Sequence, residues 1–252
     1  MRTILLPHAE VRILPDSAAL ARAAADEFIR SARAAVAAHA RFTVALSGGS
    51  TPKATFALLA TDELRGANKL PWDKVHVFFG DERHVPPDHD DSNYRMATDA
   101  LLAKVPIPPG NVHRVHAELA AAVAAAEYES ELRRVFNPRP GEFPRFDLIV
   151  LGMGPDGHTA SLFPGTAALE EHRALVVANW VEKLKSHRIT LTYPVLNAAA
   201  EVLFVAGGAD KADMLRHVLL GDPSGHTYPA QFVRPQNGQL LWLMDEAAAG
   251  KL

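Results

Sequence analysis

The sequence predicts an α/β protein built on an open, mainly parallel sheet. Short, almost wholly apolar runs at residues 42–46, 75–79, 146–151 and 202–205 are typical of parallel strands that are buried on both faces. Helical patterns separate these runs, as strand–helix–strand units require. Glycines and charged residues follow each run, and ligands of open α/β sheets bind just beyond the carboxyl ends of the strands. We therefore expect the candidate site at this edge of the sheet.

The composition is that of a globular protein, with 48% hydrophobic and 22% charged residues in a chain of 252. No repeat or low-complexity linker interrupts it, so residues 1–252 are expected to form one domain. The formal net charge of -3 gives no global field that favours nucleic acid or an anionic membrane. Cysteine is absent, which excludes disulfides, thiolate nucleophiles and cysteine-ligated zinc. No apolar stretch has the length of a membrane span or the form of a signal sequence, so we expect a cytoplasmic protein.

In the N-terminal half, small and apolar residues recur at every fourth position from Leu20 to Val36. They form one face of a helix that begins at Asp16 and ends near Ala40. The run at 42–46 is followed by a glycine loop and a helix to about residue 60. The run at 75–79 leads through a charged loop to a helix over 93–102, a short strand at 112–115 and a helix over 118–136.

In the C-terminal half, a loop rich in proline and glycine leads into the buried run at 146–151. Residues 174–181 and 189–192 are predicted strands, and residues 202–205 form another buried strand. A helix then extends to about Leu220, and residues 240–244 are the last predicted strand.

The glycine loop after the first buried run is a candidate phosphate site. Gly48 and Gly49 allow close approach of the backbone to a ligand, and Ser50 and Thr51 offer hydroxyl groups. Pro52 suits a first helical turn, whose free N–H groups can face an anion. The spacing differs from that of a nucleotide P-loop and indicates a small phosphate ester. A simple helix cap explains the hydroxyl residues but not the paired glycines.

The loop after residues 75–79 places Asp81 and Arg83 at the same edge of the sheet. Acids beside an arginine at the carboxyl end of a strand are candidates for function. The acidic segment from Asp88 to Tyr94 is interpreted as a solvated loop that caps the next helix. We do not predict a metal site there, because no second group of ligands completes one.

Three glycines, at positions 152, 154 and 157, form a sharp turn after residues 146–151, and this turn carries Asp156 and His158. The glycine spacing matches the dinucleotide-binding pattern, but Pro155 removes a backbone donor and Asp156 would repel a pyrophosphate. For this segment alone, a purely structural interpretation stays open, with Asp156 as a cap and His158 without a chemical role.

Four motifs together resemble the 6-phosphogluconolactonase family. They begin at Ser47 (SGGSTP), Gly80 (GDERHVP, with SNY beyond it), Gly152 (GMGPDGHTASLFP) and Arg188 (RITLTYPVLN), and they stand in the family's order. The resemblance implies a doubly wound, Rossmann-like sheet with helices on both faces, shared with glucosamine-6-phosphate deaminase and related sugar-phosphate isomerases. It also implies hydrolysis of 6-phospho-D-glucono-1,5-lactone to 6-phosphogluconate, the second step of the oxidative pentose phosphate pathway.

The same resemblance implies roles for individual residues. His158 matches the family's proposed general base, and Arg83 matches the arginine near the reacting end of the substrate. The positions that match those holding the phosphate are Gly48, Gly49, Ser50, Thr51, Arg188 and Lys211. One residue departs from the related deaminases: Phe163 stands where they carry a glutamate that serves the histidine during ring opening. This departure favours ester hydrolysis.

A lactone is an activated acyl group, so the expected mechanism needs a base for water and no covalent nucleophile. His158 would take the proton from water, and Arg83 would stabilise the oxyanion. Either Asp156 or Asp81 would orient the imidazole, and the sequence leaves this choice open. We expect no metal, organic cofactor, nucleic acid or membrane partner, and the oligomeric state is left open. The alternatives are an aminosugar-phosphate deaminase or isomerase and a non-catalytic sugar-phosphate sensor.

Overall fold

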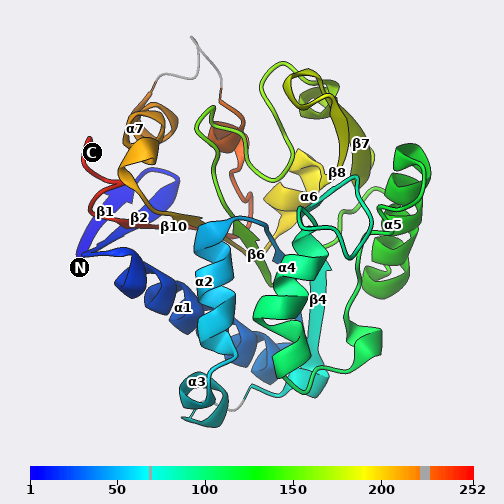
Figure 1. Cartoon of the computed structure of the whole chain (residues 1–252), viewed down its shortest axis with the longest axis horizontal. Coiled ribbons are helices and arrows are strands. Elements are labelled where there is room, and N and C mark those ends of the chain that lie inside the picture. The colour runs from blue at the N-terminus through cyan, green and yellow to red at the C-terminus, as the bar shows by residue number, and fades with distance from the viewer. Residues whose placement is uncertain (68–69, 222–227) are drawn as a thin grey trace.

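The computed structural model describes residues 1–67, 70–221 and 228–252, with the side chains of residues 65–67 left aside. A seven-stranded sheet lies at its centre, in the order β1-β2-β10-β9-β6-β3-β4 (Figure 1). All neighbouring strands are parallel except β1 and β2. The strands are β1 (Arg2–Leu6), β2 (Ala9–Leu14), β3 (Phe42–Leu46), β4 (Val75–Phe79), β6 (Leu148–Leu151), β9 (Glu201–Ala206) and β10 (Gln239–Asp245). The mainly parallel sheet confirms the predicted fold class.

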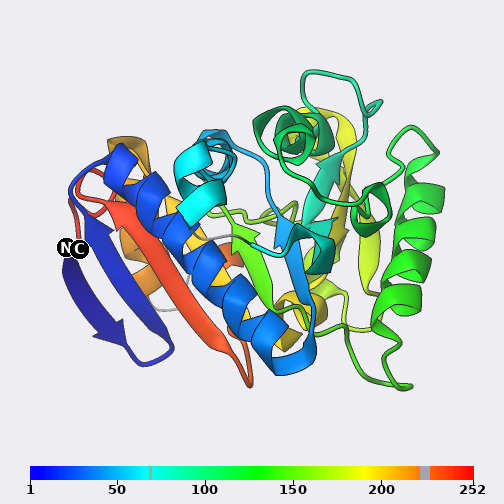
Figure 2. The ribbon, with the colours of Figure 1, turned by 90° about the horizontal axis from the view of Figure 1, so that it is seen from below.

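Helices cover both faces of this sheet, and each face has its own hydrophobic core. One core is formed with α1 (Ser17–His39), α2 (Ser50–Leu59), α3 (Asp62–Ala67) and α4 (Asn93–Ala100). Figure 2 shows α1 lying across the strands on this face. The other core is formed with α5 (Ala121–Phe136), α6 (Tyr193–Ala198) and α7 (Ala212–Leu220). Short 3-10 turns occupy Trp72–Lys74, Leu102–Lys104, Pro109–Asn111, Ala167–Glu170, Glu182–Leu184, Ala209–Lys211 and Pro229–Phe232.

A second, three-stranded sheet lies beside the carboxyl ends of the parallel strands. Its order is β5 (Asp81–Arg83), β8 (Ser186–Leu191) and β7 (Val176–Val181), and all its pairs are antiparallel. The register sets Asp81 opposite Thr190 and Arg83 opposite Arg188. Residues directly opposite each other in such a pair point to the same face. This sheet therefore carries Asp81, Arg83 and Arg188 on one surface.

Several elements differ from the sequence prediction, among them α3 and β5, which were not predicted. The hairpin of β1 and β2 was not expected, because charged residues such as Arg2, Glu10 and Arg12 interrupt its apolar residues at the sheet edge. Helix α6 was also missed. The predicted strand at 112–115 is absent as a strand, since only the single bridge between Val112 and Val77 extends β4 there. Among the helices of the described ranges, none combines the length and the apolar character needed to cross a membrane.

Candidate active site

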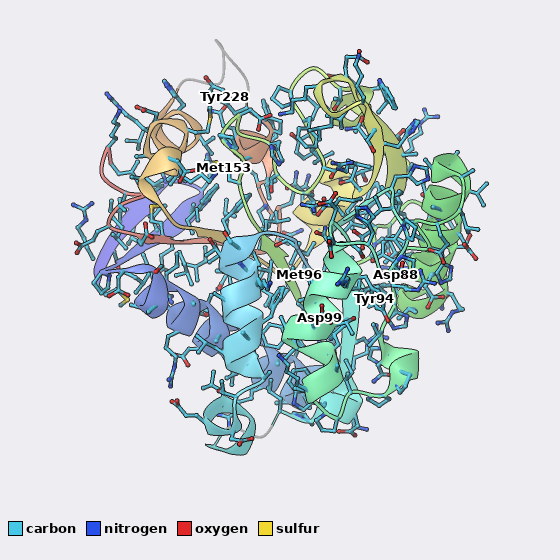
Figure 3. All side chains as sticks on the ribbon, in the orientation of Figure 1. Asp88, Tyr94, Met96, Asp99, Met153 and Tyr228 are labelled. Carbon is cyan, nitrogen blue, oxygen red and sulfur yellow. The ribbon has the colours of Figure 1, made fainter. Side chains whose placement is uncertain are left out.

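A cavity of about 280 Å³ opens at the carboxyl ends of β3, β6 and β9, with β5 along one side. Its walls come from four segments that are far apart in the sequence, three loops and strand β5. Met153, labelled in Figure 3, belongs to the loop after β6. The lining residues are Ser47, Gly48, Gly49, Ser50, Thr51, Pro52, Asp81, Arg83, Gly152, Met153, Gly154, His158, Ala160, Val205, Ala206, Gly207, Asp210 and Lys211. The cavity therefore lies at the edge of the sheet where the sequence predicted the candidate site.

The glycine loop forms one end of the cavity and leads directly into α2. Gly49 has a φ angle of 106°, a conformation that favours glycine, and its carbonyl accepts the first helical bond, from Lys53. In the described part of the chain, no side chain caps this helix start. Ser50 and Thr51, which carry its leading N–H groups, both line the cavity, so this helix start suits an anion.

Two buried polar groups lie beneath this loop. The Ser47 hydroxyl is buried and has no hydrogen-bond partner among the described residues, although Ser47 lines the cavity. Asn93 packs so closely on Gly48 that a Cβ atom at Gly48 would lie 2.0 Å from the Asn93 Oδ1 atom. Glycine is therefore required at position 48 for reasons of packing as well as of ligand access.

Cationic side chains flank the cavity. Lys211 lines it from the turn after β9 and pairs with Asp210 at 2.9 Å. Arg83 lines it from β5 and donates to the Asp91 carbonyl oxygen at 2.8 Å. Arg188 faces Arg83 across the strand pair, and burial followed by repulsion from Arg83 lowers the pKa of Arg188. Like charges directly opposite each other destabilise a sheet, so an anion bound beside this pair would relieve an existing repulsion.

Asp81 lines the cavity but serves other partners than His158. Its carboxylate is buried and accepts a hydrogen bond from the Ser161 hydroxyl at 2.7 Å. Asn93 donates to the Asp81 backbone oxygen at 2.9 Å. No hydrogen bond joins Asp81 to His158 among the described residues. The neighbouring Glu82 caps α4 by accepting the N–H groups of Asn93 and Tyr94, and burial raises the pKa of Glu82.

His158 and Asp156 form the one carboxylate–imidazole pair that lies at the cavity within the described ranges. The Nδ1 atom of His158 lies 2.5 Å from Asp156 Oδ1. Burial alone would raise the pKa of Asp156, but hydrogen bonds from His158 and Lys183 outweigh it and hold that pKa well below its usual range. With Nδ1–H donated to Asp156, the Nε2 atom of a neutral imidazole is free to accept a proton.

The His158 ring is held between two neighbours. Phe163 stacks on it with ring centroids 4.1 Å apart and an angle of 24° between the planes. On the backbone side, a Cβ atom added at Gly154 would lie 2.0 Å from His158 Cε1. Both contacts come from the same loop after β6. The turn thus restricts the imidazole to a narrow range of positions.

The structure brings most of the predicted site residues together. Eight of the ten line the cavity, namely Asp81, Arg83, His158, Gly48, Gly49, Ser50, Thr51 and Lys211. Asp156 and Arg188 are not among the lining residues: Asp156 contacts His158, and Arg188 lies opposite Arg83 on the same face of the small sheet. Sequence reasoning missed the supporting side chains Asn93, Ser161 and Lys183. Asn93 and Ser161 lie inside quoted motifs but had no assigned role, whereas no local pattern distinguishes Lys183.

The fold and the site together define a class: doubly wound α/β proteins with a helix start that no side chain of the described residues caps and a histidine–carboxylate pair at one sheet edge. Residues 15–242 match the sequence model of the family described as glucosamine-6-phosphate isomerases/6-phosphogluconolactonase, and the chain belongs to this family. This match confirms the resemblance that the four motifs indicated.

Curated relatives and solved structures narrow the class further. A protein of a Nostoc strain named 6-phosphogluconolactonase is 48% identical over 244 residues, which cover 96% of this chain and 98% of the relative. A chloroplastic 6-phosphogluconolactonase of Arabidopsis thaliana is 43% identical over 218 residues, 84% of this chain and 65% of the relative. The structure of 6-phosphogluconolactonase from Trypanosoma cruzi aligns with a TM-score of 0.86 at 29% identity, covering 100% of this chain and 99% of that one.

Proposed function

We propose that this chain hydrolyses 6-phospho-D-glucono-1,5-lactone to 6-phospho-D-gluconate, the second step of the oxidative pentose phosphate pathway. Nearly full-length similarity to proteins named 6-phosphogluconolactonase supports this reaction. One observation of the site carries the proposal: a histidine–carboxylate pair and an uncapped helix start face the same small cavity. The first provides a base for water, and the second provides a place for the substrate's phosphate.

In the proposed mechanism, His158 Nε2 takes a proton from water as the water oxygen attacks the lactone carbonyl carbon. The carbonyl becomes a tetrahedral oxyanion, and the Arg83 guanidinium stabilises its negative charge. The intermediate then collapses: the bond between this carbon and the ring oxygen breaks, and the proton on His158 passes to the departing oxygen. Asp156 holds the imidazole in the tautomer that this sequence of steps requires. The mechanism calls for no metal or cofactor.

The phosphate would bind at the start of α2, with Lys211 in the same cavity and Arg188 beside Arg83 on the same face of the small sheet. Binding energy from this remote group would position the lactone carbon against His158. Phe163 supports hydrolysis over deamination, because its ring covers one face of His158 and has no group that can transfer a proton. A cytoplasmic location and a single domain over residues 1–252 belong to the same proposal.

The test compares wild-type protein with His158→Ala on freshly prepared 6-phosphogluconolactone, followed by NMR against the spontaneous rate. We expect kcat to fall about 10²- to 10⁴-fold in the variant, the usual contribution of a general base. His116→Ala is a matched control, since His116 is half exposed and pairs with Glu127 away from the cavity. Near-normal turnover by His158→Ala would exclude the assigned base. Equal use of unphosphorylated gluconolactone would contradict the phosphate site.

A further inference from the structure

The tip of the hairpin between β7 and β8 touches the turn that carries His158. The tip is the 3-10 turn Glu182–Leu184 followed by Lys185, which has a positive φ angle. Lys183 projects from this tip, and its ammonium donates to Asp156 Oδ2. The two residues are 27 positions apart in the chain. A hairpin of the small antiparallel sheet thus contacts a loop of the parallel sheet at the site.

Both oxygens of the Asp156 carboxylate are engaged by these contacts. Oδ1 faces His158 Nδ1 at 2.5 Å, and Oδ2 accepts from Lys183. The Lys183 ammonium also lies 4.7 Å from the centroid of the Phe163 ring, which stacks on His158. Lys183 therefore contacts both side chains that touch the imidazole, Asp156 at its edge and Phe163 on its face.

We propose that Lys183 is a positioning residue, which fixes Asp156 and Phe163 and through them the orientation of His158; this proposal rests on the proposed function. A carboxylate held at one oxygen rotates about its Cβ–Cγ bond, whereas one held at both oxygens does not. Asp156 is 29% exposed, so without a second partner water competes for it. The cation over the Phe163 ring adds a second contact that keeps the ring against His158.

Two other roles for Lys183 make different predictions. If Lys183 bound the substrate's phosphate, its removal would raise KM; however, Lys183 is absent from the residues that line the cavity, and its ammonium is occupied by Asp156. If Lys183 only stabilised the hairpin, its removal would lower Tm without changing His158. A positioning role lowers kcat and leaves KM nearly unchanged, because the substrate still binds but the base is less often aligned.

The variants are Lys183→Met, Lys183→Arg and the control Lys185→Met. Lys185 lies on the same hairpin tip and pairs with Glu182, so its replacement removes the same charge without touching Asp156. We expect kcat to fall about 10-fold in Lys183→Met, to recover largely in Lys183→Arg and to stay unchanged in Lys185→Met. In an Asp156→Asn background, Lys183→Met should have a clearly smaller effect, since the ion pair with Asp156 is already lost and only the contact with Phe163 is removed.

A second measurement does not depend on activity. The 15N shifts of the His158 imidazole, assigned by their loss in His158→Ala, should report the Nδ1–H tautomer in wild type and a mixture of tautomers in Lys183→Met. Equal kcat in Lys183→Met and Lys185→Met with an unchanged tautomer overturns the positioning role. A full effect of Lys183→Met in the Asp156→Asn background overturns it too. If wild type fails to hydrolyse the lactone, the proposed function falls, while the tautomer shift still tests the link from Lys183 to His158.

Discussion

Replacing Gly154 by alanine is a direct test of the position of His158, because the change adds one methyl group beside the imidazole. The added Cβ would lie 2.0 Å from His158 Cε1 and 2.1 Å from Nδ1. Gly154 does not have a positive φ angle, so alanine brings no backbone strain of its own. Phe163 stacks on the ring with centroids 4.1 Å apart and leaves little room for a shift over that face. The imidazole must therefore turn out of its place.

The size of the displacement follows from these distances. A relaxed contact of 3.4 Å exceeds the available 2.0 Å by 1.4 Å, and a shift of this size would break the 2.5 Å contact between His158 and Asp156. A misplacement of about 1 Å in a catalytic geometry lowers the rate about 10²-fold. Complete loss of a general base sets the upper limit at about 10⁴-fold. We expect kcat of Gly154→Ala to fall between these limits, with a smaller change in KM.

The assay is hydrolysis of fresh 6-phosphogluconolactone followed by NMR, with Tm measured on the same samples. Gly110→Ala serves as the control, because a Cβ at Gly110 would meet nothing within 4 Å and Gly110 lies away from the cavity. A variant that keeps its fold and turns over at the wild-type rate would refute the placement of the imidazole. Loss of folding would leave the 15N shifts of His158 in the remaining native fraction as the deciding measurement.

Two further predictions concern stability. Tyr128→Phe should lower the free energy of unfolding in urea by about 1–3 kcal/mol, because the buried Tyr128 hydroxyl accepts from the N–H of Phe79 and donates to its carbonyl. A loss below about 0.5 kcal/mol, half the net contribution of one hydrogen bond, would contradict this. The pKa of His76 is lowered, chiefly by burial and then by the charges of His113, Arg41 and Arg134. As the pH falls below about 6.5, this histidine therefore takes up a proton more readily in the unfolded chain than in the folded one. The free energy of unfolding declines as a result. His76→Gln should therefore lose less stability than wild type between about pH 7 and pH 5, and parallel losses in both proteins would exclude His76 as a source of the decline.

The strands that are buried on both faces could be predicted closely from the sequence. For the half-buried strands, the sequence did not show with which strands they pair. The runs at 42–46 and 75–79 coincide with β3 and β4, because a strand buried on both faces needs an uninterrupted apolar run. Strands β7 and β8 were found, but nothing local showed that they pair with β5 in a sheet of their own. The pairing of Arg83 with Arg188 depends on the register between segments about a hundred residues apart, which no local pattern encodes.

The same distinction applies to the site. Gly48 to Thr51, Asp81 and Arg83 come soon after buried strands, so the rule that ligands bind at carboxyl ends was sufficient to make them candidates. The same rule pointed to the turn of His158, but the roles of His158 and Lys211 came from the family resemblance. Lys183 reaches Asp156 from a hairpin tip, and Ser161 reaches Asp81 across 80 positions. These contacts are products of tertiary packing. In the sequence, Lys183 and Ser161 belong to no local pattern that would indicate these contacts.

The sequence left Asp81 and Asp156 as alternative partners of His158, and the two acids make different contacts because their surroundings differ. Asp81 is buried, and its carboxylate oxygens accept hydrogen bonds from Ser161 and Asn93. It therefore joins the loop after His158 to the start of α4. Asp156 is partly exposed and sits within the turn, two residues before His158, where a short side chain reaches the imidazole. An ionised Asp156 beside the cavity would repel a substrate phosphate. Lys183 donates to the Asp156 carboxylate and offsets its charge, so in the proposed mechanism this one ion pair would both orient the base and keep the cavity favourable for an anion.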